Sequence, residues 1–292
     1  MARHWTRKKA LRAGLVALGL AAAVAAWQRD AMLHGGSAEQ QHALAQQLLA
    51  RHGDAAQHQR ALALLQAAAQ QGHAEAAYTL AQWHDGSRGG RIDRARALAL
   101  LQRAAEAGHR QAQVALAFHH FNGSGGATRD MAQAAHWFGQ AAAGGAVIAQ
   151  CMMGDLHRTG AGGVPQDDAR AMRWYAASAT QDDRCAPKAQ FALYVGYEAG
   201  QGVARDLAIA TGWLRKAAEA GNPRAQFTLG RAYETGYGVP RDHELARSWI
   251  RKSREGVSWH DDHEHGELRA SFPSWVTQGG GLAVYQALSR AN

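Results

Sequence analysis

A short run near the end of the chain carries the side chains best suited to metal chemistry. Between His260 and Glu267 there are three histidines and four carboxylates within eight residues. Imidazole nitrogens and carboxylate oxygens are ligands for Zn²⁺ and related ions. Their spacing matches no known metal-site pattern, and a solvated polar run has the same composition. We therefore assign neither a metal nor a cofactor to the chain.

The chain has two cysteines, Cys151 and Cys185, which an exported protein could join as one disulfide. Cys151 falls near the start of one predicted helix, and Cys185 falls in the connection before a later one. Both lie at one edge of neighbouring structural units, and a bridge requires their Cα atoms to come within about 7 Å. Two reduced cysteines that pack as small hydrophobes are the alternative. The sequence leaves both states open.

Motifs for catalysis are missing from the sequence. It contains no Gly-x-Ser-x-Gly nucleophile elbow, no phosphate-binding Gly-x-x-x-x-Gly-Lys-Ser/Thr loop, no His-Glu-x-x-His and no Cys-x-x-Cys. The glycine-rich run 122–126 is explained as a turn between two helices. We expect a protein that is not an enzyme.

Most of the chain is built from one repeated pattern. Counted from the opening alanine of each copy, the spacings are 36, 37, 40 and 36 residues, within the range of helical solenoid units. A weaker copy precedes these five. The opening residues are Ala76, Ala112, Ala149, Ala189 and Ala225.

Each copy predicts a helix, a turn and a second helix. Small or apolar residues at offsets 0, 4, 5 and 8 from the opening alanine share one face of the first helix. Paired glycines end that helix, because they permit backbone angles that other residues resist, and the clearest pairs are Gly200 with Gly202 and Gly236 with Gly238. An aspartate then caps the second helix. Seven residues later a large side chain is expected to fill the same pocket in each copy; four of these are Trp137, Trp174, Trp213 and Trp249.

The cleanest copy, from Ala225 to Trp249, resembles the Sel-one-like repeat (SLR), a relative of the tetratricopeptide repeat. The resemblance covers residues 38–255. It implies an all-α fold, a right-handed α-solenoid (superhelix) of five to six SLR/TPR-like helix-turn-helix repeats. It also implies a protein-binding adaptor, and in bacteria often one that works in the cell envelope.

By resemblance to tetratricopeptide domains, the first helices line a concave face. Offsets 6 and 9 from each opening alanine point into it, and the residues there vary between repeats. Variable residues on a constant frame are what a specific partner groove requires, with two phenylalanines as aromatic anchors and charges as a selective rim. Filling of gaps between repeats is the alternative role for the phenylalanines. The candidate partner groove consists of Gln82, Asp85, Phe118, Phe121, Asp155, Arg158, Val195, Glu198, Arg231 and Glu234.

The two ends of the chain lie outside the repeats. Residues 1–27 have five basic residues followed by an uncharged stretch, which predicts a signal peptide or an N-terminal membrane anchor. Without this segment the formal charge of +8 falls to +3, since 27 basic residues face 24 acidic ones. This balance argues against nucleic-acid binding. Residues 256–292 form a C-terminal extension, in which 282–288 are expected to form a capping helix.

We therefore expect a non-enzymatic scaffold in the bacterial periplasm or cell envelope, either secreted after cleavage or anchored in the inner membrane by residues 10–27. Its expected partner is another envelope protein or peptide, bound through the concave face of the solenoid. Two alternatives remain. One is a periplasmic regulator of a membrane sensor or of a secretion or polysaccharide machine, and the other is a β-lactam-binding or hydrolysing SLR protein.

Overall fold

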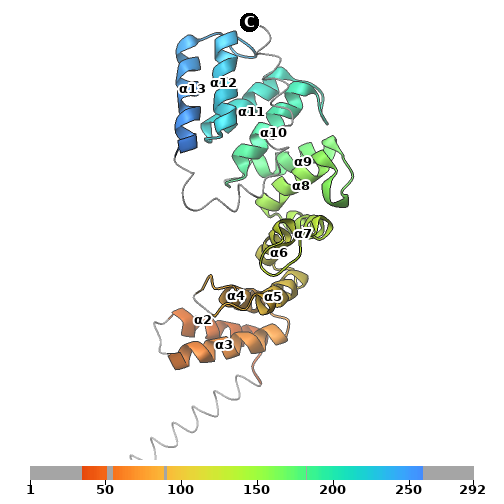
Figure 1. The fold of residues 1–292 in the computed structure, drawn as a ribbon, viewed down its shortest axis with the longest axis vertical. Helices are drawn as coiled ribbons and strands as arrows, with labels where there is room; N and C mark the ends of the chain where they lie inside the picture. Colours follow the sequence, from red (N-terminus) through yellow and green to blue (C-terminus); the bar gives the residue numbers. More distant parts are fainter. Residues whose placement is uncertain (1–34, 51–54, 89–90, 182, 259–292) are drawn as a thin grey trace, which may run out of the picture. The chain divides into compact units, whose positions relative to one another are not determined.

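The computed structural model describes residues 35–50, 55–88, 91–181 and 183–258. In these ranges the chain forms twelve α-helices and one 3-10 turn, with no strand (Figure 1). This confirms the expected all-α repeat fold. The chain divides into two compact units, of which the first ends at Ala112 and the second begins at Gln113.

Unit 1 contains two helical hairpins and the first turn of a further helix. Each helix packs on the next one along the chain. Fully buried Leu64, Leu65 and Ala68 of one hairpin and Leu80 of the next supply the apolar contact. The helices are α2 (Ala38–Ala50), α3 (Ala55–Gln70), α4 (Ala74–His84) and α5 (Arg94–Glu106).

Unit 2 continues the same hairpin pattern through four repeats (Figure 1). From α7 onward each helix packs on the next, and α8 also touches α10. The buried Phe138, Tyr175 and Leu214 of successive second helices anchor three apolar clusters. The elements are α6 (Arg110–Asn122), α7 (Met131–Ala143), α8 (Val147–Thr159), η1 (Ala161–Gly163), α9 (Asp168–Ala179), α10 (Ala186–Ala199), α11 (Leu207–Glu219), α12 (Pro223–Thr235) and α13 (His243–Ser258).

Aspartates start the second helices, as the repeat pattern predicts. In each case a carboxylate oxygen accepts a hydrogen bond from a backbone N–H two or three residues later; Asp206 Oδ1, for example, accepts from Ile209 at 2.9 Å. Such a cap satisfies one of the free amide groups at a helix start. The capping residues are Asp93, Asp130, Asp167, Asp206 and Asp242.

The two glycines of each pair have different structural roles. Gly236 ends α12 in the left-handed conformation, with φ of 79°. Gly238 instead allows close stacking, because a Cβ there would lie 2.6 Å from Oγ1 of Thr211 in the preceding repeat. The other pair divides these duties in the same way: Gly200 ends α10, and a Cβ on Gly202 would lie 2.3 Å from the carbonyl group of Asp168.

The four tryptophans that recur at one position of the second helix are less buried than expected. Trp137, Trp174, Trp213 and Trp249 are partly exposed and pack at the edges of the apolar clusters. The residue after each of the first three is the fully buried one: Phe138, Tyr175 and Leu214. A helix turns by about 100° per residue, so the next position points further into the core. The Nζ atoms of Lys216 and Lys252 cover the exposed faces of Trp213 and Trp249, each 4.4 Å from the ring centroid.

The predicted ends of the chain fall largely outside the described residues. The targeting segment 1–27, the polar run 260–267 and the capping helix 282–288 all lie there. Helix α13 continues to Ser258, three residues past the predicted end of the repeats. Among the helices of the described ranges, none is long and apolar enough to cross a membrane.

Candidate functional site

The two groove candidates in unit 1 organise the turn after α4. Oε1 of Gln82 accepts a 2.8 Å hydrogen bond from Nε of Arg88. Asp85 is exposed, and its Oδ1 accepts a 2.7 Å hydrogen bond from the backbone N–H of Ser87. Both side chains are thus held by the residues that follow them.

The two phenylalanines of α6 are not equivalent. Phe121 is only 6% exposed, so the expectation of an exposed anchor is wrong for this residue. Phe118 is partly exposed. Both rings meet Phe138 of α7 nearly edge-on. The distance between ring centroids is 5.0 Å for Phe118 and 6.4 Å for Phe121. Edge-to-face pairs are a favoured aromatic contact, and Phe121 makes this contact from within the core.

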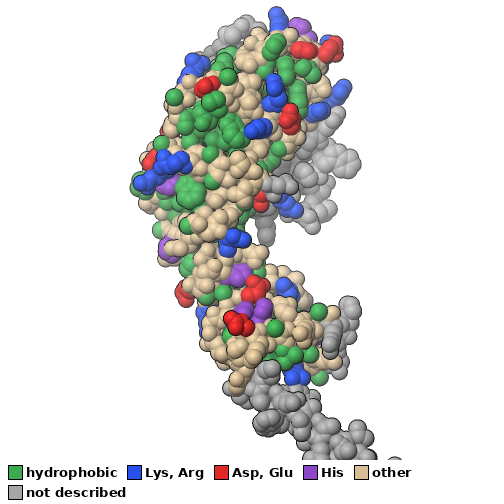
Figure 2. All heavy atoms as spheres, turned by 180° about the vertical axis from the view of Figure 1, so that it is seen from behind, with side chains coloured by type: hydrophobic (Ala, Val, Ile, Leu, Met, Phe, Trp, Pro, Cys, Tyr) green, Lys and Arg blue, Asp and Glu red, His purple; other side chains and the backbone are tan. Residues whose placement is uncertain are grey.

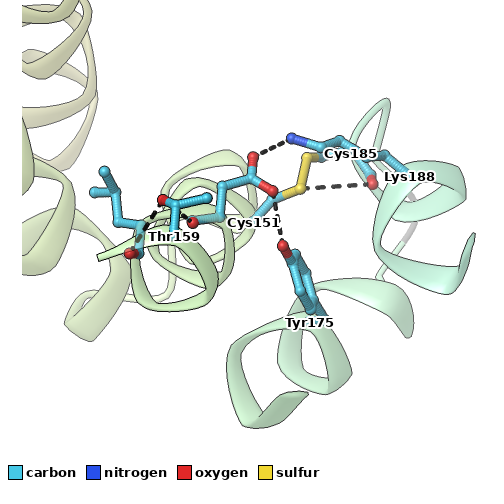
Figure 3. A network of polar contacts seen from close by, with 7 residues as sticks. Cys151, Thr159, Tyr175, Cys185 and Lys188 are labelled. Atoms are coloured by element: carbon cyan, nitrogen blue, oxygen red, sulfur yellow. Dashed lines mark hydrogen bonds and ion pairs between the residues drawn. A yellow bond between two sulfur atoms is a disulfide. The ribbon is translucent and has the colours of Figure 1, made fainter. Parts of the chain in front are cut away.

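Asp155 is also buried, at 4% exposure, and cannot be part of a solvent-facing rim. The Tyr175 hydroxyl donates a 2.7 Å hydrogen bond to Oδ1 of Asp155, and Nζ of Lys188 pairs with Oδ2 (Figure 3). A buried carboxylate needs such partners, because an unpaired charge is expensive to remove from water. The pKa of the Tyr175 hydroxyl is raised well above its usual value, first by burial and then by the charge of Asp155. This network ties α8, α9 and α10 together.

A disulfide lies beside this network. Cys151 of α8 is bonded to Cys185, the N-cap residue of α10, with their Cα atoms 6.5 Å apart (Figure 3). Cys151 is fully buried. The bridge therefore joins two successive first helices.

The disulfide occupies a position where other repeats carry different contacts. We call this position the seam: it pairs the residue at offset 2 of one first helix with the N-cap residue of the next first helix. In unit 1 the seam holds two ring pairs, His42 with His73 and Tyr78 with His109, each with centroids 4.4 Å apart. The repeat pattern did not single out these residues, because the residue types at the seam change from repeat to repeat.

The seam histidines also cap helices. Nδ1 of His73 accepts from the backbone N–H of Ala76 at 3.2 Å, and Nδ1 of His109 accepts from that of Ala112 at 3.1 Å. Since Nδ1 of His109 is an acceptor, its Nε2–H donates the 2.7 Å hydrogen bond to Oε2 of Glu75. Each ring therefore joins the start of a first helix to a side chain of the preceding repeat.

These groups form a polar patch at the start of α4 and α6. His73, Glu75 and His109 line an open pocket of about 500 Å³. Figure 2 shows histidine and acidic side chains side by side on the part of the chain that α2–α5 form. The pKa of His42 is lowered, mainly by burial and next by the nearby His73, while Glu75 opposes the shift. No group of three or more His, Cys, Asp or Glu in the described ranges could hold a metal ion.

The remaining groove candidates lie in unit 2 and stay partly exposed. Oε1 of Glu198 accepts a 2.9 Å hydrogen bond from the hydroxyl of Tyr237 in the next repeat. Nη1 of Arg231 and Oε2 of Glu234 are 2.5 Å apart. We call the partly exposed set the unit 2 face: Phe118, Arg158, Val195, Glu198, Arg231 and Glu234.

Comparison with known proteins agrees with the geometry. The Sel1 repeat family profile matches residues 38–73, 74–109, 110–145, 147–183, 187–222 and 223–256. The fold is similar to a protective antigen of uropathogenic Escherichia coli that displays an SLR fold, with 30% identity and a TM-score of 0.64 over 78% of this chain. It is also similar to a Sel1 repeat protein of Oxalobacter formigenes, with 26% identity and a TM-score of 0.61 over 79% of this chain.

The chain spans 48% and 65% of the lengths of these two proteins. None of the curated proteins matches its sequence significantly.

Proposed function

This chain belongs to the Sel1 repeat family, and from that premise we propose that it is a scaffold of the bacterial cell envelope that binds a partner protein through the unit 2 face. Sel1 repeat proteins are generally protein–protein interaction scaffolds without catalytic activity. Partner choice then depends on side chains that vary on a constant helical frame.

The observation that carries this proposal is the way the charged side chains of the unit 2 face are held. Glu198 is fixed by Tyr237 of the next repeat, and Arg231 is fixed by Glu234. Side chains that are already ordered lose little conformational entropy when a partner binds. Charges of both signs, together with the partly exposed Phe118 on the first helix of unit 2, favour a partner with complementary charges and an apolar anchor.

Export rests on two features of the chain. The basic and apolar segment 1–27 has the pattern of a targeting signal. The disulfide between Cys151 and Cys185 persists in oxidising compartments such as the periplasm. A fusion of residues 1–27 to a reporter that is active only outside the cytoplasm is expected to be active. An inactive fusion of normal abundance would contradict export.

The partner surface is tested by site-specific photo-crosslinking in cells. A photoreactive amino acid at Val195 is expected to trap a discrete partner. The same amino acid at the exposed Ala208 of α11 is expected to trap none. Glu198→Gln and Arg231→Gln together should then reduce the adduct at least about tenfold if the charges select the partner. Adducts at Ala208 alone, or adducts that both charge changes leave intact, would place the binding surface elsewhere.

A further inference from the structure

The last repeat breaks a row of buried alanines. Each second helix ends with an alanine that is at most 2% exposed in the first five repeats: Ala69, Ala105, Ala142, Ala179 and Ala218. At the equivalent position of α13 the residue is Arg254, which is exposed. A second row changes in the same way, since the buried Ala135, Met172 and Thr211 are followed by the exposed Arg247.

In the earlier repeats of unit 2, the first helix of the next repeat covers these rows. Glutamines at offset 1 of that helix donate to the carbonyl oxygens of the row: Gln190 to Ala179 at 2.9 Å and Gln226 to Ala218 at 3.1 Å. A Cβ on Gly196 of α10 would lie 2.3 Å from Sδ of Met172, which shows how closely the helix approaches. A guanidinium in either row leaves no room for that packing.

The terminal edge of α13, which we define as Arg247, Arg251 and Arg254, is therefore suited to acidic groups and not to another repeat. Arg247 pairs with Glu244 of the same helix, and both side chains are largely exposed. Residues 207–254 contain nine Lys and Arg against four Asp and Glu, a net charge of +5. Outside the first 27 residues, this is where the positive charge of the chain gathers.

The sequence that follows has the opposite charge. Residues 255–292 contain two Lys and Arg against five Asp and Glu, a net charge of −3. Four of those five acidic residues fall between 261 and 267, and a repeat spacing of 36 from Ala225 reaches residue 261. The acidic run thus stands, in the repeat register, where the next first helix would begin. A segment so near in the chain also has a high effective concentration at the edge.

We propose that the terminal edge of α13 binds the acidic run 261–267 of the same chain, so that the stack ends in an ionic contact. The run lies outside the described residues, and the proposal rests on the arginines that interrupt the two rows and on the opposite charge of the two segments. This contact is independent of the partner proposed for the unit 2 face.

Limited proteolysis of the full chain tests the contact, because chymotrypsin cleaves after aromatic and large apolar residues and the run is flanked by Trp259 and Leu268. Arg247→Gln with Arg254→Gln should raise the initial rate of cleavage at these two sites at least about fivefold at low salt. The ratio of the two rates should approach one at about 0.5 M salt, where the Debye length is only a few ångströms. The matched control is Arg215→Gln with Lys216→Gln, which removes two exposed charges one repeat earlier and should leave the rate unchanged.

A charge exchange separates the contact from simple damage to α13. Arg247→Glu with Arg254→Glu should be cleaved rapidly, and adding Asp261→Lys, Asp262→Lys and Glu264→Lys should restore slow cleavage. Equal cleavage rates of the parent and the Gln variant at low salt, or a failed restoration, would overturn the proposal. So would a variant with neutralised acidic residues that gains binding to phosphatidylglycerol vesicles while its cleavage rate stays that of the parent, since the edge would then be a lipid-binding surface.

Discussion

At the scale of single residues, burial and not residue type decides which candidates can meet a partner. Phe118 and Phe121 are one turn apart on α6, yet only Phe121 is in the core. Asp155 and Arg158 have the same spacing on α8, and only Asp155 is buried. Offsets 6 and 9 lie at the border of the buried face. Phe121 turns inward against Phe138, and Asp155 turns inward to bind Tyr175 and Lys188.

The two phenylalanines should therefore differ in their effect on stability. Phe121→Ala is expected to destabilise unit 2 by about 3 kcal/mol or more, because it leaves a cavity against Phe138. Phe118→Ala should cost clearly less, since part of its ring is already in water. Urea unfolding of each variant measures both values. Equal losses for the two variants would show that Phe118 is as much a core residue as Phe121.

The buried carboxylate of Asp155 allows a second residue-scale prediction. Lys188→Met removes its ionic partner and leaves a charge in a site that is 4% exposed, so we expect a loss of about 3 kcal/mol. Adding Asp155→Asn should recover much of that loss, because the amide oxygen can still accept from the Tyr175 hydroxyl. Chemical denaturation of the single and double variants compares them. A double variant less stable than Lys188→Met would contradict this account.

At the scale of elements, the repeat pattern predicted the helices and their caps but missed the ring pairs of the seams, whereas the two cysteines already indicated a possible disulfide there. The caps could be predicted because the same local feature, an aspartate just before the second helix, recurs from copy to copy. Seam partners such as His42 and His73 are 31 residues apart, and their chemistry changes from ring pairs to a disulfide. A position that varies in residue type gives no periodic signal, although each pair joins neighbouring first helices.

The histidine seam should make unit 1 sensitive to acid. The pKa of His42 is below its ordinary value of 6.5 in the folded chain, so the unfolded chain binds this proton more readily. The contribution of His42 to the free energy of unfolding is therefore full above pH 6.5. It decreases as the pH falls from there towards the lowered pKa. The titratable side chains that act on His42 are His73 and Glu75, and Nδ1 of His73 accepts the hydrogen bond that caps α4.

His42→Tyr tests this, because Tyr78 fills the same position in the next repeat. We expect the melting temperature of the variant to fall less than that of the parent between about pH 7 and about pH 5. His243→Gln, an exposed histidine of α13, is the matched control and should keep the parent's pH dependence. A His42→Tyr profile parallel to the parent's would show that the stack does not sense pH.

At the scale of the whole molecule, a repeat stack is held by contacts between neighbours, and its stability can differ from one part to another. Unit 2 has a covalent contact in its interior, whereas the seams of unit 1 are ring pairs. The disulfide joins α8 to the start of α10, while the Asp155 network and the apolar cluster around Tyr175 connect α8, α9 and α10. These three helices are therefore expected to be the most stable part of unit 2.

Removing the disulfide should weaken that part first. A cross-link with a sequence separation of 34 restricts the unfolded chain by up to about 4 kcal/mol in the loop-entropy description. Cys151→Ser with Cys185→Ser is expected to speed amide hydrogen exchange in α8 and α10 more than in α12 and α13, which serve as the internal reference. The parent treated with a reductant should follow the same pattern, because the changed helices are those the bridge joins. An unchanged exchange rate in α8 and α10 would mean that noncovalent contacts alone hold these repeats together. The disulfide would then not contribute to the rigidity with which unit 2 holds its exposed charges.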